Sequence, residues 1–133
     1  MKASELIQPV QDIAVAIVPE ETDGESTWMV YLVNLKNDEL SNVLITANGY
    51  GELNEKPIKT STLRYFIEAV PPHAYSVIEP IMKDVFGLNN EYWVSFYIGG
   101  NIYDKKFVFL PESILESNFV TIPLLNKKGV MIR

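Results

Sequence analysis

The stretch Tyr92-Trp93-Val94-Ser95-Phe96-Tyr97-Ile98-Gly99-Gly100-Asn101-Ile102-Tyr103 carries the clearest local signal in the sequence. Aromatic and β-branched residues, which suit extended strands, stand on both sides of the glycine pair. Either Gly99-Gly100 or Gly100-Asn101 can supply the positive φ values that a two-residue primed turn requires. The stretch therefore predicts a tight β-hairpin, with strands over 91–98 and 102–110.

A two-residue turn also fixes which side chains of the two strands share a face. One face is almost entirely apolar and is the predicted core side: Tyr92, Val94, Phe96, Ile98, Tyr103, Phe107 and Phe109, interrupted by Lys105. The other face is mixed and is the predicted outer side: Trp93, Ser95, Tyr97, Ile102, Asp104, Lys106 and Val108.

Five further runs rich in Val, Ile, Thr, Tyr and Phe precede the hairpin, bounded by proline, glycine and polar residues. They occupy 12–18, 27–35, 42–48, 60–70 and 74–79. The best helical pattern, 81–86, predicts only one or two turns. Seven strands without intervening helices predict an all-β, antiparallel β-sandwich, with a closed barrel as the alternative.

In strand number and spacing, residues 12–110 resemble the immunoglobulin-like and fibronectin-type-III-like sandwiches. The chain contains no Cys, so the disulfide of antibody domains is absent. Tyr92 lies where such folds have their tyrosine corner, which implies a buried ring whose hydroxyl bonds nearby backbone. The resemblance implies a fold and no particular activity, because unrelated functions share this fold.

Residues 111–133 lie outside the seven runs but are too apolar for a solvated tail. We therefore expect a single β-sandwich domain over 1–133, with its core in 12–110 and a closing segment, 111–133, that adds a strand or covers an apolar face. The run 28–33 is apolar on both faces and requires cover on each. The closing segment is the expected cover, and a homodimer contact is the alternative.

The 133 residues carry a net charge of -6. Residues 1–110 hold 8 basic and 15 acidic side chains, a net charge of -7, and residues 111–133 carry +1. The acidic balance argues against a nucleic-acid partner, and it suits a slightly basic segment docking on an acidic body. We recognise no signal peptide and no run long enough to span a membrane, so a cytoplasmic location is expected and export stays open.

Catalytic machinery is not expected. The absence of Cys excludes thiol catalysis and thiolate metal sites. His73 is the single histidine, and we interpret it as an exposed turn residue rather than a general base or metal ligand. The carboxylate pairs Glu52 with Glu55 and Glu68 with Glu79 make a small glycan hydrolase the last-ranked hypothesis.

Two segments have the composition of an ion or phosphate site without its spacing. The acidic run 20–25 lacks the EF-hand pattern, because Val30 stands where the last Glu ligand belongs, and we expect a flexible loop there. Asn48-Gly49-Tyr50-Gly51 lacks the Lys-Ser or Lys-Thr of a phosphate loop, and we expect a turn or bulge ending the third strand. No metal and no cofactor is therefore predicted.

Surface aromatics supply the candidate binding site. Trp93 and Tyr97 of the outer face, with Trp28 or Tyr31, would form a flat aromatic platform. We therefore predict a non-catalytic protein-interaction or assembly module that binds a protein partner, or a second copy, through this platform or an open sheet edge. A carbohydrate-binding module that uses the same aromatics is the alternative.

Overall fold

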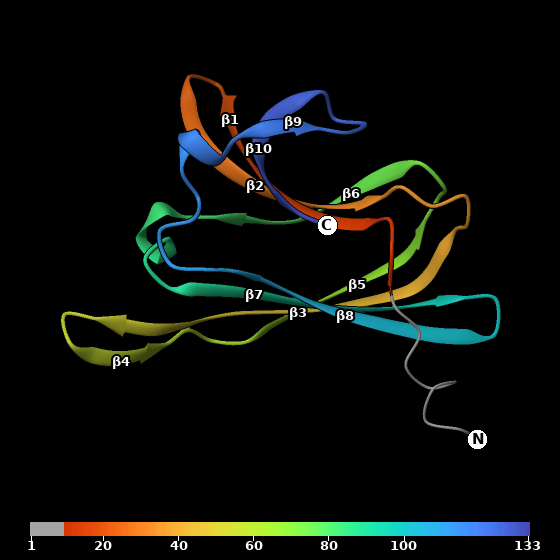
Figure 1. Cartoon of the computed structure of the whole chain (residues 1–133), viewed down its shortest axis with the longest axis horizontal. Coiled ribbons are helices and arrows are strands. Elements are labelled where there is room, and N and C mark those ends of the chain that lie inside the picture. The colour runs from red at the N-terminus through yellow and green to blue at the C-terminus, as the bar shows by residue number, and fades with distance from the viewer. Residues whose placement is uncertain (1–9) are drawn as a thin grey trace.

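A computed structural model describes residues 10–133, and most of them lie in antiparallel β-strands (Figure 1). The strands are β1 (Ile13–Thr22), β2 (Glu25–Asn34), β3 (Leu40–Leu53), β4 (Lys56–Lys59), β5 (Leu63–Val70), β6 (Ala74–Ile81), β7 (Asn89–Ile98), β8 (Asn101–Phe109), β9 (Val120–Ile122) and β10 (Lys127–Ile132). The 3-10 turns η1 (Lys83–Val85) and η2 (Glu116–Asn118) complete the fold, and η1 falls within the predicted helical stretch 81–86. None of the described residues forms a helix long and apolar enough to cross a membrane.

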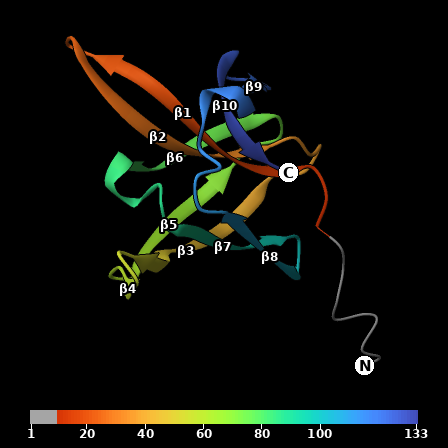
Figure 2. The same ribbon diagram turned by 60° about the vertical axis from the view of Figure 1, so that its left-hand side comes forward.

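The strands form two sheets stacked as a sandwich, which confirms the predicted fold class (Figures 1 and 2). The first sheet has the order β6-β2-β1-β10-β9, and the second has the order β4-β3-β7-β8, with β5 also paired to β3. Buried residues alternate with exposed ones along β3 and β7, as the two-residue period of a strand requires. The inward side chains of the two sheets form one core: Ile13, Val15, Ile17, Val30 and Leu32 from the first sheet, Val43, Ile45, Tyr92, Val94, Phe96 and Phe107 from the second.

The hairpin of β7 and β8 forms as predicted, with Ile98 paired to Asn101 across the glycine turn. Gly99 has a φ of 60°, the left-handed conformation that this turn needs. The core face pairs Phe96 with Tyr103, whose rings stack at 5.6 Å between centroids. Lys105 is the polar exception on that face, and its ammonium lies 5.2 Å from the centroid of the Phe107 ring.

The structure has ten strands where the sequence predicted seven. All seven predicted runs are strands, and the three additional ones are β4, β9 and β10. β4 reads Lys-Pro-Ile-Lys and is fully exposed, so it carries neither the composition nor the alternation of a buried strand. β9 and β10 lie in the closing segment, where β9 has only three residues and β10 contains Gly129.

Two segments predicted as a loop and a strand end lie largely in paired strands. The acidic run 20–25 belongs to a tight hairpin, in which β1 and β2 pair as far as Thr22 and Glu25 and only Asp23 and Gly24 make the turn (Figure 2). The segment 48–51 does not end β3, which continues to pair with β4. A Cβ at Gly49 would lie 3.2 Å from Cγ2 of Thr60, so this glycine permits a close approach rather than a turn.

The closing segment packs on the sandwich in both predicted ways. β10 pairs with β1 and β9 pairs with β10, so the segment extends the first sheet. The buried Ile122 and the half-buried Leu125 pack on the outer side of that sheet, against Ala14, Ala16, Val18, Tyr31 and Val33. The ion pairs Lys127–Glu20 and Arg133–Asp12, both 2.8 Å long, join its basic side chains to the acidic body. The second apolar face of β2 is thus covered within the chain.

Candidate functional site

The outer face of the second sheet carries five exposed large apolar side chains from four neighbouring strands: Leu44, Phe66, Trp93, Tyr97 and Ile102. We call this set the aromatic face. The register places Phe66 opposite Leu44 and Tyr97 opposite Ile102. Because all of them are exposed, no described segment of the chain covers this face.

Trp93 and Tyr97 lie together on this face, but Trp28 and Tyr31 do not join them. Both of the latter belong to β2, which pairs with β1 and β6 in the other sheet. Trp28 packs edge-on against Phe86 with 5.1 Å between the ring centroids, at the margin of the core. Tyr31 is buried and its hydroxyl donates to the Glu20 carboxylate. The platform predicted from the sequence therefore loses these two members.

Phe66 and Leu44 are site residues that sequence reasoning missed. The run Tyr65-Phe66-Ile67 is apolar at every position, so its composition conceals which side chain points outward. The register decides this, since Tyr65 and Ile67 pack on the core while Phe66 is exposed. Ile102 was predicted to face outward, and only the pairing of β3 with β5 and β7 shows that it shares one surface with Phe66.

Polar neighbours hold the Trp93 ring in place on the aromatic face. Its Nε1 donates to Oδ2 of Asp104 at 3.2 Å, and Nζ of Lys106 lies 4.7 Å from its ring centroid. Lys106 in turn lies 3.8 Å from the Glu91 carboxylate. One side of the indole thus already carries an ammonium group, which contributes a cation–π contact of about 0.5–1 kcal/mol at an exposed site.

The structure separates one of the predicted carboxylate pairs, Glu68 with Glu79. Glu79 accepts hydrogen bonds from the hydroxyls of Tyr65 at 2.6 Å and Tyr92 at 2.8 Å. Glu68 stands three residues after the core-facing Tyr65, so it belongs to the opposite side of β5 and is exposed. Glu52 and Glu55 are exposed on the β3–β4 ribbon.

The ring of Tyr92 is buried, as the tyrosine-corner resemblance implied. Its hydroxyl, however, bonds the Glu79 side chain and not nearby backbone. The partner differs because Glu79 of β6 reaches the end of this ring across the sandwich. The hydrogen bond from Tyr92 to nearby backbone, which the resemblance implied, was therefore a wrong prediction.

His73 is an exposed turn residue, as expected. It has a φ of 51°, and its Nε2 lies 2.7 Å from Oδ1 of Asn37. No group of three or more His, Asp or Glu side chains that could hold a metal occurs among the described residues.

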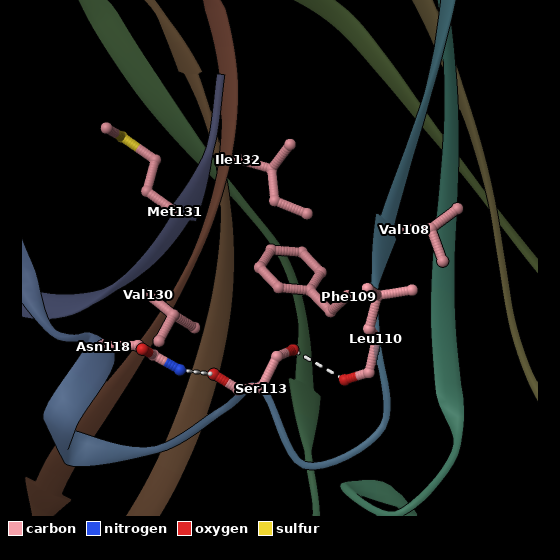
Figure 3. A pocket seen from close by; sticks show the side chains of 8 residues that line it. All are labelled: Val108, Phe109, Leu110, Ser113, Asn118, Val130, Met131 and Ile132. Atoms are coloured by element: carbon pink, nitrogen blue, oxygen red, sulfur yellow. Dashed lines mark hydrogen bonds between the residues drawn. The ribbon is translucent and has the colours of Figure 1, made fainter.

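An apolar cavity of about 260 Å³ lies between the end of β8 and β10, beneath the segment that links β8 to η2 (Figure 3). Its few polar groups bond one another: Ser113 Oγ donates to the Leu110 carbonyl at 2.6 Å, and Asn118 Nδ2 donates to the Ser113 carbonyl at 2.9 Å. Few directional groups are therefore left for a ligand. A second cavity, of about 400 Å³, lies between β6, η1 and β3.

The tyrosines that bond Glu79 are expected to make the protein sensitive to alkali. Burial and the hydrogen bond to Glu79 raise the pKa of Tyr65 to about 12, and burial with the Glu79 charge raises the pKa of Tyr92 further. The stabilisation is complete below the unfolded pKa of about 10 and is lost as pH rises through the folded pKa. Urea unfolding between pH 9 and pH 12 should show this decline.

The free energy of unfolding of the Tyr65→Phe variant should decline less steeply over the same pH range. A titration followed by tyrosinate absorbance should lose one late-ionising group in this variant. An unchanged late phase would show that Tyr65 ionises with the exposed tyrosines.

No protein-family model and no curated protein matches the chain. The function has to be inferred from the fold and from the geometry of its surfaces.

Proposed function

We propose that the protein is a non-catalytic interaction module that binds a second copy of itself through the aromatic face. The observation that carries this proposal is the set of five exposed large apolar side chains on one uncovered sheet face. Contiguous exposed apolar surface of this kind marks protein contacts, and aromatic residues are enriched in interfaces.

The sandwich is best interpreted as immunoglobulin-like, of the fibronectin type III kind. Of the seven strands expected from the sequence, the first, second and fifth (β1, β2 and β6) lie in one sheet. The third, fourth, sixth and seventh (β3, β5, β7 and β8) lie in the other. This division of three and four strands is the one found in fibronectin type III domains, and it supports the resemblance without identifying a function.

The charge pattern on β5 favours a second copy over an unrelated protein. Arg64 and Glu68 stand two residues before and after Phe66 and are exposed with it. A two-fold axis that passes through Phe66 across the strands brings Arg64 of one copy towards Glu68 of the other. The same axis sets Trp93 towards Tyr97 on either side of Ser95, so these aromatic side chains would meet in the contact.

Two of the open strand edges, those of β8 and β6, suit partner binding less well than the face does. β8 ends the second sheet and carries charged side chains, which oppose strand addition. β6 ends the first sheet and contains Pro80, which has no amide proton to donate.

The carbohydrate alternative uses Trp93 and Tyr97 as well, but a sugar ring would compete with Lys106 for the indole.

We expect the wild-type protein to form a concentration-dependent dimer and the Phe66→Asp variant to weaken it at least about tenfold, as loss of a central aromatic residue does in other interfaces. The variant places a charge at the centre of the apolar surface. Sedimentation velocity over a series of protein concentrations measures both dissociation constants.

Leu110→Asp is the matched control, because Leu110 is 62% exposed and Phe66 is 64% exposed, but Leu110 lies outside the aromatic face. It should leave the dimer unchanged. A wild-type protein that sediments as a monomer up to about 1 mM, beyond the range of a weak specific complex, would refute the proposal.

A further inference from the structure

The second cavity, of about 400 Å³, has a size typical of small-molecule sites. It lies between the two sheets, with lining residues from β6 of the first sheet and from β3 and β7 of the second. β3 forms one wall through Ala47 and Gly49, β6 and η1 form the opposite wall, and β7 lies at its base with Asn90 and Tyr92. It is separate from the aromatic face, which lies on the outer side of the second sheet.

The charged groups of this cavity all have the same sign. Glu79 and Asp84 line it, and none of the described lining residues is Lys, Arg or His. Apolar side chains, among them Leu63, Ile81 and Met82, complete the walls. A cavity with acidic and apolar lining and no basic group favours a ligand that combines a positive charge with an apolar body.

The base of the cavity presents a fixed acceptor. Asn90 is only 5% exposed, and its Nδ2 already donates to the carbonyls of Val85 at 2.9 Å and Leu88 at 3.2 Å. These bonds direct Oδ1 towards Gly49, where a Cβ would lie 3.5 Å from it. Since Asn90 and Gly49 both line the cavity, the amide oxygen faces it as an acceptor held by two bonds.

Glu79 adds a second acceptor whose position is also fixed. The hydroxyls of Tyr65 and Tyr92 donate to its two carboxylate oxygens, one to each. Each oxygen has two lone pairs, so the carboxylate can still accept from a ligand. The tyrosines thus orient the carboxylate without neutralising it.

We propose that this cavity binds a small amine, with its ammonium group directed to Asn90, Glu79 and Asp84 and its apolar body against Leu63 and Met82. An ammonium group has three donors and no acceptor, which matches a lining that offers acceptors. This site is independent of the proposed self-association.

Benzylamine and benzyl alcohol are suitable probes, because they differ in charge and little in shape. Titrated into the full-length, ¹⁵N-labelled protein, benzylamine should shift the amide resonances of Gly49 and Asn90. Benzyl alcohol should bind at least about tenfold more weakly. Equal binding of the two probes, or no shift of these amides at about 50 mM benzylamine, a concentration beyond ordinary weak binding, would overturn the proposal.

Asp84→Asn tests the contribution of charge. Asp84 is exposed, so the variant should fold, and it should weaken benzylamine binding by about two- to fivefold, the effect of a partly screened charge. Asp38→Asn removes an exposed acidic group before the start of β3, at the opposite end of that strand from Ala47 and Gly49, and should leave the affinity unchanged. If Asp84→Asn binds benzylamine as the wild type does, charge does not select the ligand and the proposal fails.

Discussion

Replacement of Gly129 by alanine is expected to detach β10 from β1. A Cβ at this position would overlap the carbonyl oxygen of Ile17 and lie 3.1 Å from Cα of Val18. Both contacts are with the backbone of a buried strand, which no side-chain rotation can relieve. The chain must therefore separate from β1, and the buried Val130 and Ile122 would lose their packing.

We expect Gly129→Ala to lower the free energy of unfolding by about 3 kcal/mol, the upper end of the range for overpacked cores. The thermal midpoint should fall by roughly 10 °C for a domain of this size. Hydrogen exchange should locate the damage, because the amides of β9 and β10 should lose protection before those of β3 and β7.

Gly100→Ala is the matched control, because no heavy atom lies within 4 Å of its Cβ position. It should change the free energy of unfolding by less than about 0.5 kcal/mol. A Gly129→Ala protein with wild-type stability and wild-type protection of β10 would contradict the close approach.

The seven runs that composition predicted as strands are strands because each presents alternating or continuous apolar residues to one core. A two-residue turn fixes which side chains share a face, whether Gly99-Gly100 or Gly100-Asn101 forms it, but only the structure shows that Ile98 pairs with Asn101. Gly129 shows where this reasoning ends. Its position against Ile17 depends on the contact of two segments more than a hundred residues apart, and nothing in the local sequence indicates it.

The candidate site was predictable to the extent that local pairing determines it. Trp93 and Tyr97 share a face because both lie on β7 and are four residues, or two strand periods, apart. Trp28 could not be assigned, because its surroundings depend on whether β2 pairs with β7 or with β6. The cavity at Asn90 could not be predicted from the sequence, because residues of β3, β6 and β7 line it together and no single run contains them.

Asn34 ends β2 in a fully buried position, and its side chain bonds four backbone groups. Its Nδ2 donates to the carbonyls of Asp38 at 2.9 Å, Val70 at 3.2 Å and Pro71 at 3.0 Å. Its Oδ1 accepts from the amide of Lys36 at 3.0 Å. The side-chain amide of Asn34 therefore joins the turn after β2 to the turn after β5. Since β2 and β5 belong to different sheets, these hydrogen bonds connect the two sheets.

Asn34→Asp should destabilise the protein by about 3 kcal/mol or more at pH 7, because it removes both donors and places a buried charge beside three carbonyl oxygens. Burial beside three carbonyl oxygens, with only the Lys36 amide left as a donor, raises the pKa of the new carboxyl above its ordinary value of about 3.9. The penalty is thus present at high pH and shrinks as pH falls through the raised pKa, since the protonated acid regains one donor. Urea unfolding at pH 7 and pH 4 measures the difference between variant and wild type.

Asn101→Asp makes the same chemical change at an exposed turn and should cost less than about 0.5 kcal/mol at either pH. If the Asn34→Asp penalty were equally large at both pH values, loss of the Nδ2 donors rather than buried charge would cause it. If the penalty were as small as that of Asn101→Asp, the turns after β2 and β5 would be held together without this amide. The pH dependence therefore separates the effect of the buried charge from the loss of the Nδ2 hydrogen bonds, because Asn34→Asp leaves the size of the side chain unchanged.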